Sequence, residues 1–484
     1  MHSSQLITEL ERILSKDRLV TDVETLRPYE CDGLSAYREL PVAVAIPSEI
    51  SQISAILKFC MSHEIPVVAR GAGTSLSGGA KPLKEGIVLS LARFNKILEI
   101  DPANRIARVQ PGVRNISISE AAAPFGLYYA PDPSSQIACT IGGNVAENAG
   151  GVHCLKYGLT VHNVLKVDVV LANGEQISFG STGLDWPGYD CLALLNGSEG
   201  LLGIVTEVTV RLLPKPTSAQ VILAAFNDIG TAGNAVGSII ASGILPAGLE
   251  MMDNLAIRAT EDFVACGYPI EAVSILLCEL DGPLSDVTEQ VEQVQRLLVS
   301  EGATEIRVSQ SEDDRLRLWS GRKSAFPAVG RISPDYYCID GTIPRYRLAS
   351  ILRSIYSLSR EYELAVANVF HAGDGNLHPL ILYDASKPGE LKKTEELGGK
   401  ILELCIRAGG TITGEHGVGV EKLNQMCIQF SEVEIAQFHA LKRAFDPKGI
   451  LNPGKAIPSL ARCAELNGVH VHNGVLSFPD LERF

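Results

Sequence analysis

The chain has 484 residues, of which 46% are hydrophobic and 20% are charged. These are ordinary globular values, so disorder is excluded as the main state. The 42 basic and 56 acidic residues give a net charge of −14. A surface this acidic repels phosphate backbones, so nucleic acid is not expected as a partner. There is no run of about 18 apolar residues and no apolar stretch typical of a signal peptide, so we expect a cytoplasmic protein without a membrane-spanning helix.

The cysteines are 11 in number and lie singly between Cys31 and Cys463. An odd count without any C-x-x-C pair is not typical of a disulfide framework or of an iron–sulfur cluster held within one polypeptide. We therefore expect these cysteines to be small buried hydrophobic residues in a reducing compartment.

The first half of the chain alternates predicted helices with short β-rich runs. Apolar residues at helical spacing, Leu6, Leu10, Ile13 and Leu14, predict an N-terminal helix, and residues 49–63 predict a second one with Ser48 as its N-cap. The β-rich runs are 41–47, 65–70, 86–91, 164–175 and 203–216. Glycine-rich clusters lie at 71–86, 142–158, 197–203 and 409–419.

The run LLPKP (212–216) predicts a boundary, because its two prolines end the preceding strand. After it, strand-like runs alternate with helical stretches, of which 285–302 is the clearest. These patterns predict an α+β protein with a first domain over 1–217 (core about 38–217), a second over 218–425 and a C-terminal segment over 426–484. Further runs are 220–226, 272–280 and 336–344 for strands, and 432–446 for a helix.

The first glycine-rich segment, Val67–Ala80, follows directly on a predicted apolar strand. Its glycines allow successive backbone N–H groups to face one concavity, and such a nest binds a phosphate without a lysine. The segment lacks the G-K-[ST] ending of a P-loop, and Leu76 occupies the position of the last glycine in a dinucleotide-binding fingerprint. On these residues alone, a purely structural turn is an equal alternative.

Two further segments have the same character. Tyr129–Gly151 is long, polar and poorly helical, and loops of this length inside a compact domain are usually functional. Gly197–Val210 passes through a glycine turn into a strand whose backbone could contact the edge of a ring. Three such loops in one domain favour a cofactor site over three unrelated turns.

With these loops in place, the chain resembles the FAD-binding domains of the vanillyl-alcohol oxidase type, also called the p-cresol methylhydroxylase (PCMH) type. The resemblance implies that the first loop holds the pyrophosphate of FAD and that the second and third surround the flavin. Thr74 stands where some relatives carry a histidine that bonds covalently to the flavin, so FAD should be bound non-covalently. The implied cofactor-binding residues are Arg70, Gly71, Ala72, Gly73, Thr74, Ser75, Ser77, Gly78, Pro131, Asp132, Gly142, Gly143, Asn148, Gly150, Glu199, Gly200, Gly203, Ile204, Val205 and Asn452.

Three of the ten histidines lie in two other segments. FHAGDGNLHPLIL (370–382) reads as a hairpin with a loop over 373–376, which would place His371 opposite His378 with their Cβ atoms about 5 Å apart. GGTITGEHGVG (409–419) supplies Glu415 and His416 between glycines. Two imidazoles and a carboxylate form a known open metal-ligand set, although a single histidine is more often a hydrogen-bonded core or surface residue.

The H-x-G-D-G-N-x-H and G-E-H-G-x-G segments are similar to those of FAD-dependent 2-hydroxy-acid dehydrogenases. The similarity extends over YECDGLSAY (29–37), the stretch 321–345 and the ending FPDLERF (478–484). It implies that His371, His378 and Glu415 bind a divalent metal ion (Zn, Mn or Fe) and that His416 is the catalytic base.

The same resemblance bears on the substrate. Arg322 is the implied clamp for a substrate carboxylate, with Lys323 as a rival and a solvated helix charge as the alternative. Cys338 stands where the hydroxyglutarate-oxidising relatives carry a lysine that helps to hold their substrate. A substrate with one carboxylate would not need that lysine, which favours glycolate or D-lactate.

The glycolate-oxidising branch of the family also implies partners. These are a second FAD-type subunit and an iron–sulfur subunit that pass electrons to quinone, so that contact with the membrane is indirect. The alternatives are a D-lactate dehydrogenase that works without partner subunits, a zinc hydrolase built on His371, His378 and Glu415, and a non-catalytic subunit that keeps only the fold.

Overall fold

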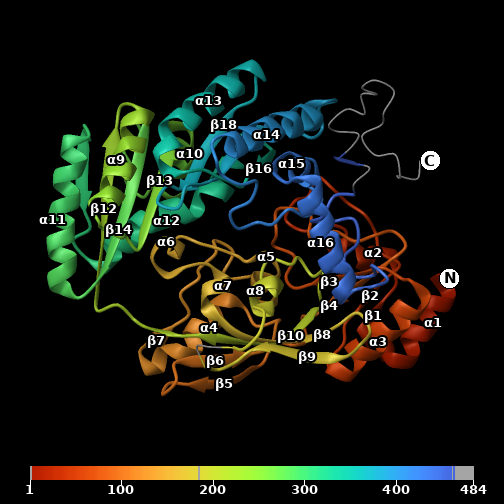
Figure 1. Cartoon of the computed structure of the whole chain (residues 1–484). Helices are drawn as coiled ribbons and strands as arrows, with labels where there is room; N and C mark the ends of the chain where they lie inside the picture. Colours follow the sequence, from red (N-terminus) through yellow and green to blue (C-terminus); the bar gives the residue numbers. More distant parts are fainter. Residues whose placement is uncertain (1–2, 184–185, 460–461, 464–484) are drawn as a thin grey trace.

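The computed structural model describes residues 3–183, 186–459 and 462–463, so the ending 478–484 lies outside the described residues. It shows two parts, an N-terminal part with three sheets and a second part built on one large sheet (Figure 1). Among the described residues, no helix combines the length and the apolar character needed to cross a membrane.

The first sheet of the N-terminal part has the strand order β1-β2-β4-β3, with β2, β4 and β3 parallel. Its strands are apolar on both sides because helices cover both faces: α1 and α3 pack on one face, and Leu26 of α2 packs on the other. The elements are α1 (Ser3–Ile13), β1 (Leu19–Val20), α2 (Val23–Leu26), β2 (Ala43–Ala45), α3 (Ile50–His63), β3 (Val67–Arg70) and β4 (Ile87–Ser90), with short 3-10 turns at Lys16–Arg18 and Arg27–Tyr29.

The second sheet is antiparallel, in the order β5-β6-β10-β8-β9, and a two-stranded pair, β7 and β11, lies apart from it. Valines that alternate along β8 and β10 pack under α4 and α5. The elements are β5 (Ile97–Asp101), β6 (Ile106–Val109), α4 (Asn115–Ala122), a 3-10 turn (Ala123–Phe125), β7 (Leu127–Tyr128), α5 (Ile141–Glu147), α6 (Cys154–Tyr157), α7 (Thr160–Asn163), β8 (Val164–Val170), β9 (Gln176–Gly180), α8 (Cys191–Leu195), β10 (Ile204–Arg211) and β11 (Leu213–Pro214).

The second part contains an antiparallel sheet with the central order β15-β12-β14-β13-β18. Helices α9, α11, α13 and α14 share a core with one face of this sheet, whereas α10 and α12 cover the other (Figure 1). Its elements are β12 (Ser218–Phe226), α9 (Ile229–Ala241), β13 (Gly248–Asp253), α10 (Asn254–Val264), β14 (Ser274–Gly282), α11 (Leu284–Ser300), β15 (Glu305–Val308), α12 (Glu312–Val329), β16 (Asp335–Cys338), β17 (Gly341–Thr342), a 3-10 turn (Arg345–Arg347), α13 (Leu348–Glu361), β18 (Val366–His371), β19 (Asn376–Leu377), β20 (Pro379–Tyr383) and α14 (Glu390–Arg407).

The C-terminal segment returns to the N-terminal part after helices α15 (Leu423–Gln429) and α16 (Glu432–Phe445). The backbone N–H of Val67 donates to the carbonyl of Ile450 at 2.8 Å, and the N–H of Asn452 donates to the carbonyl of Val67 at 2.8 Å. The segment therefore adds a short parallel bridge beside β3, directly ahead of the first glycine-rich loop.

Two local expectations were wrong. The second helix begins at Ile50, and Glu49 rather than Ser48 is its N-cap, in a reciprocal capping box with Gln52. Cys427 and Cys463 form a disulfide, although the cysteines were expected to be buried thiols without a disulfide framework; the two lie 36 residues apart, and folding brings their Cα atoms to 5.1 Å. The other nine cysteines are free thiols, and seven of them are buried, as predicted.

Candidate active site

The main pocket lies where the three glycine-rich loops of the N-terminal part face α12 and the Glu415–His416 loop of the second part. It encloses about 360 Å³, which falls within the usual range for small-molecule and cofactor sites. The predicted residues on its wall are Arg70, Gly71, Ala72, Gly73, Thr74, Ser75, Gly142, Gly143, Gly150, Glu199, Gly200, Gly203, Val205, His378, Glu415 and His416.

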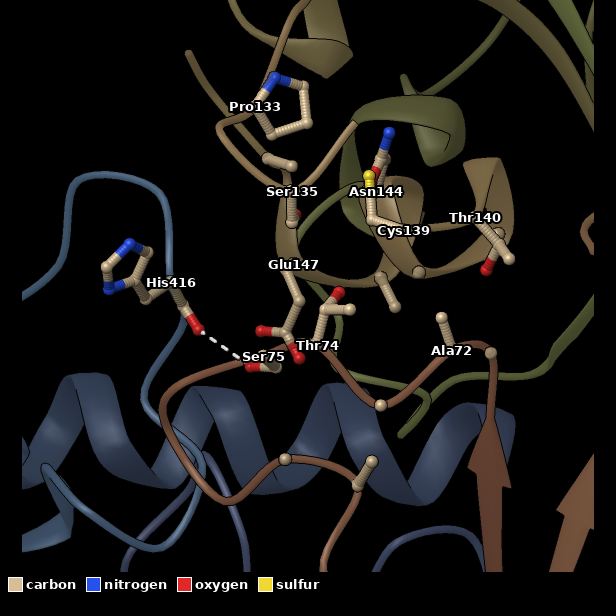
Figure 2. Close-up of a pocket in the computed structure, with 18 of the residues that line it drawn as sticks. Ala72, Thr74, Ser75, Pro133, Ser135, Cys139, Thr140, Asn144, Glu147 and His416 are labelled. Atoms are coloured by element: carbon tan, nitrogen blue, oxygen red, sulfur yellow. Dashed lines mark hydrogen bonds between the residues drawn. The ribbon is translucent and has the colours of Figure 1, made fainter. Parts of the chain in front are cut away.

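The first and second loops meet closely because glycines leave room for them to do so. A Cβ atom built on Gly71 would lie 2.3 Å from Oγ1 of Thr140, at the start of α5. Gly73 has a positive φ of 71°, and a side chain there would strike the guanidinium of Arg70. The two loops therefore lie against each other, and Figure 2 shows Ala72, Thr74 and Ser75 on the first loop with Thr140 and Asn144 on the second. A phosphate-binding nest of N–H groups in the first loop stays a prediction.

The remaining predicted cofactor residues support the wall from behind. Asp132 accepts hydrogen bonds from the backbone N–H and Nδ1 of His153, and Asn148 ends α5. Nδ2 of Asn452 donates to the carbonyls of Gly79 and Glu199. Direct contact of this group with FAD stays a prediction. The group is Ser77, Gly78, Pro131, Asp132, Asn148, Ile204 and Asn452.

The hairpin that carries the two histidines has a different register from the predicted one. His371 pairs with Asn376, not with His378, because the loop spans Ala372–Gly375 and Gly375 adopts a positive φ of 76°. His378 is thus a diagonal neighbour of His371 on the same face of the sheet. The two rings still meet, with centroids 5.1 Å apart and planes at 80°.

The carboxylate of Glu415 lies at the centre of three imidazoles. Its Oε1 is 3.3 Å from Nε2 of His371, 3.2 Å from Nε2 of His378 and 3.6 Å from Nε2 of His416. The His416 ring stacks on that of His378, with centroids 4.8 Å apart. The structure therefore brings together all four residues that the two motifs predicted.

Glu250, which the sequence analysis missed, holds His371 in place. It lies opposite His371 on the neighbouring strand β13, and its Oε1 is 2.7 Å from Nδ1 of His371. The other oxygen, Oε2, accepts from Nε of Arg322 at 2.8 Å, and all three side chains are buried. Although burial opposes the charged imidazole, Glu250 and Glu415 raise the pKa of His371 to about 10 in the metal-free protein.

Arg322 is thus in an ion pair inside the second part, and it does not line the pocket wall. Its Nη2 lies 2.8 Å from Oε2 of Glu250 but makes no hydrogen bond there, so this group keeps unused N–H donors. Lys323, the next residue along α12, does line the pocket. A contact between Arg322 and a substrate carboxylate stays a prediction.

Asp340, a second missed residue, shapes the loop that carries the base. This fully buried carboxylate follows β16 and accepts the backbone N–H groups of Gly414, Glu415 and His416. Against the opposing effect of burial, Lys422 and His416 hold the pKa of Asp340 well below its usual range. A permanent anion therefore orders three successive N–H groups, much as an anion occupies a backbone nest.

The donor set fits a divalent cation. The ligand atoms of His371, His378 and Glu415 lie within 4.8 Å of one another, and so do those of an overlapping set, Asp340, His378 and His416. Both ring nitrogens of His378 are buried and make no well-aligned hydrogen bond among the described residues, although Nε2 is 3.2 Å from the Glu415 carboxylate. A bound ion would satisfy one of these two nitrogens. The bond from Nδ1 of His371 to Glu250 leaves Nε2 for the ion, as in many carboxylate–histidine metal sites.

Asp340 and Glu250 were missed because neither stands in a recognisable motif. Glu250 lies in the short, largely apolar run GLEMMD, which ends at Asp253, and Asp340 precedes a glycine in YYCIDGTIP. An acidic residue inside a buried strand was the signal available, since such a group requires a partner. Glu147, in the second glycine-rich segment, was passed over in the same way although it lines the pocket.

The fold and the pocket together define a flavin-dependent oxidoreductase, and the comparisons with known proteins agree. Residues 41–180 match the model of the FAD binding domain, and residues 215–456 match that of FAD linked oxidases, C-terminal domain. The chain belongs to the FAD-linked oxidase family. Membership of this family argues against the zinc hydrolase, which the histidine motifs alone had left as an alternative function.

Three known proteins with similar sequences support this assignment. The chain is 63% identical to glycolate oxidase subunit GlcD of Escherichia coli (strain K12), covering 100% of this chain and 96% of the relative. It is 41% identical to the subunit of the same name from Bacillus subtilis, covering 90% and 93%. A D-lactate dehydrogenase of Archaeoglobus fulgidus is 36% identical, covering 86% and 91%.

Solved structures show the same fold at low sequence identity. The 4-ethylphenol oxidase of Gulosibacter chungangensis superposes with a TM-score of 0.80 at 19% identity, covering 95% of this chain and 98% of the other. For p-cresol methylhydroxylase the TM-score is 0.78 at 18% identity, with 95% and 97% covered. The predicted α+β fold with a PCMH-type FAD-binding domain is confirmed.

Proposed function

We propose that this protein oxidises glycolate to glyoxylate as the FAD-bearing catalytic subunit of a glycolate oxidase. The observation that carries the proposal is the 63% identity, over the whole chain, to a protein named as a glycolate oxidase subunit. The D-lactate dehydrogenases are more distant, at 32% and 36% identity, so a D-lactate dehydrogenase that works without partner subunits is the second candidate.

The four residues around Glu415 divide into two roles. His371, His378 and Glu415 would hold a divalent ion, which as a bound Lewis acid favours loss of the substrate hydroxyl proton. His416 lies beside this set. Although burial opposes the charged ring, Asp340 raises the pKa of His416 well above its usual value. A cation bound by the three ligands would favour the neutral imidazole, which would accept that proton. FAD, held non-covalently because Thr74 cannot form the histidyl link, would supply the acceptor for the hydride, which carries the two electrons.

The pocket is lined by several carboxyl groups, so a substrate carboxylate needs a positively charged side chain to bind there. Arg322 has unused donors but lies behind Glu250, whereas Lys323 is exposed on the pocket wall and has no ion pair within the described part of the chain. We assign the carboxylate to Arg322, as the motif implies, and the attraction of the anionic substrate to Lys323. Replacing Lys323 by alanine should then raise KM, whereas replacing Arg322 by lysine should lower kcat as well.

Electrons leave the flavin for partner subunits in this proposal. Apart from the disulfide pair, the described cysteines are single thiols, so they offer no cluster within this part of the chain. We infer a second FAD-type subunit and an iron–sulfur subunit that carry electrons to quinone, with the complex on the cytoplasmic side of the membrane and this chain attached through its partners.

Substrate comparison tests the proposal. The purified protein, with and without co-expressed partner subunits, would be assayed with glycolate, D-lactate and D-2-hydroxyglutarate and an artificial electron acceptor. We expect a higher kcat/KM for glycolate than for D-lactate, in line with the 63% identity to a glycolate oxidase subunit. D-2-hydroxyglutarate should be the poorest substrate, because Cys338 stands where the hydroxyglutarate-oxidising relatives carry a lysine. A higher kcat/KM for D-lactate in the isolated protein would favour the second candidate.

A further inference from the structure

Two carboxyl groups, those of Glu147 and Glu199, meet under the loop that carries His416. Glu147 ends α5 in the second glycine-rich segment, Glu199 lies in the third, and both line the pocket. A Cβ atom built on Gly417 would lie 2.1 Å from Oε2 of Glu147 and 3.0 Å from Oε1 of Glu199. Oε2 of Glu147 and Oε1 of Glu199 are therefore at most 5.1 Å apart. Side by side, two such groups cannot both be ionised at low cost.

The hydrogen-bond partners of the two groups differ. Oε1 of Glu199 accepts the N–H of Val418 and its Oε2 accepts that of Gly419, both at 2.7 Å. Oε2 of Glu147 is closed to solvent and has no hydrogen-bond partner among the described residues. Two backbone donors stabilise a carboxylate, and an oxygen shut away without a donor does not favour one. The negative charge therefore belongs on Glu199 and the proton on Glu147.

The surrounding charges support this division. Burial, Glu199 and Asp32 raise the pKa of Glu147 well above its usual range, against smaller opposing effects of Ser75 and His416. Burial also raises the pKa of Glu199, but its two N–H donors and the nearby Lys422 and Lys455 favour the ionised form. Figure 2 shows the Glu147 carboxyl beside Ser75, between the first glycine-rich loop and the segment of His416.

We propose that Glu147 carries a proton on Oε2, donates it in a hydrogen bond to Oε1 of Glu199, and so positions the His416 loop against the FAD pocket. The pair joins α5, the third glycine-rich segment and the loop after His416. Glycine at 79 and 417 makes room for it, since a Cβ on Gly79 would lie 2.7 Å from Oε1 of Glu147. Glu147 is thus a positioning residue, and nothing in its proposed role depends on which 2-hydroxy acid is oxidised.

Isosteric substitutions separate the two carboxyl groups. Glu147→Gln supplies an amide N–H in place of the acid proton, so it should lower turnover less than Glu199→Gln or Glu147→Leu does. Glu199→Gln removes the anion that accepts two N–H bonds, so turnover should fall by about tenfold or more. Glu147→Leu loses the donor and should resemble Glu199→Gln. Glu120→Gln, at an exposed position on α4, is the matched control and should change nothing.

Infrared spectroscopy of the FAD-loaded protein gives a readout that does not depend on activity. At neutral pH the difference spectrum between the unsubstituted protein and Glu147→Gln should contain the C=O band of a protonated carboxylic acid, and the difference spectrum with Glu120→Gln should not. A Glu147→Gln difference spectrum without this band would overturn the proposal. So would a loss of turnover in Glu147→Gln as large as in Glu199→Gln, because the proton would then not be on Glu147.

Discussion

The FAD pocket and the histidine cluster adjoin each other, but they are built by different means. The pocket wall in the N-terminal part consists mainly of backbone and small residues, and its shape depends on glycines such as Gly71 and Gly73 that let backbone segments approach. The histidine cluster consists of titratable side chains, almost all buried, that depend on one another through Glu250 and Asp340. A backbone cradle should tolerate the loss of single side chains, whereas a buried charge network should not.

The largest effect is expected from the predicted metal ligands. His378→Ala removes a side chain shared by both candidate ligand sets, so bound metal and turnover should both be lost, by more than the roughly 10–100-fold typical of an outer partner. FAD should remain bound, because the loops that hold it are unchanged. Metal content by mass spectrometry, flavin absorbance and turnover would be measured together. Simultaneous loss of the flavin would show that the two regions are not independent.

His416→Ala should lower kcat by about 10²–10⁴-fold, the range for a lost general base. The imidazole stacks on His378 but is not part of the predicted ligand set, so metal and flavin should both stay bound. Steady-state kinetics and flavin content provide the check. A variant that keeps most of its activity would remove His416 from the mechanism.

Glu250→Gln should weaken metal binding by about 10–100-fold with little effect on the flavin spectrum. The substitution keeps the size of the side chain but removes the charge that orients Nδ1 of His371 and pairs with Arg322. Titration with the metal ion would measure the dissociation constant. Glu312→Gln, an exposed acid on α12, serves as the control.

Gly71→Ala tests the backbone region in the same way. The new Cβ would lie 2.3 Å from Oγ1 of Thr140, so the first and second loops must separate, and the dissociation constant for FAD should rise by about tenfold. Metal content should not change. Gly237→Ala on α9, where nothing lies within 4 Å, is the matched control.

The smallest effect is expected at the contact between the two parts. His153 lies between Asp132 and Glu279, which raise its pKa well above the usual value although burial opposes the charge. His153→Gln should lower the free energy of unfolding by about 1.5–3 kcal/mol. The folded-state pKa is raised, so this stabilisation is complete below the unfolded pKa of about 6.5 and declines as pH rises through the folded value. Denaturant unfolding of both proteins at several pH values would measure the difference in their free energies of unfolding. We expect this difference to shrink at high pH; a difference that does not change with pH would show that His153 is uncharged.

The sequence predicted the pocket better than the support of the histidine cluster. Glycines mark places where the backbone must approach something, so the loops around Gly71, Gly142 and Gly200 could be read directly. Glu250 and Asp340 could not, because each meets its partner only after folding: Glu250 reaches His371, 121 residues away, through pairing of β13 with β18, and Asp340 accepts the backbone N–H of His416, 76 residues away, in a loop. The hairpin register failed for a related reason, since a positive φ at Gly375 moves the turn by one residue.

Anaerobic mixing with glycolate tests the central claim most directly, namely that FAD works beside an ion held by His371, His378 and Glu415. The metal-loaded protein should lose its flavin absorbance when glycolate is added. The same preparation stripped with a chelator, or the Glu415→Gln variant, should keep it until metal is restored or a chemical reductant is added. Equally fast bleaching with and without metal would contradict the account.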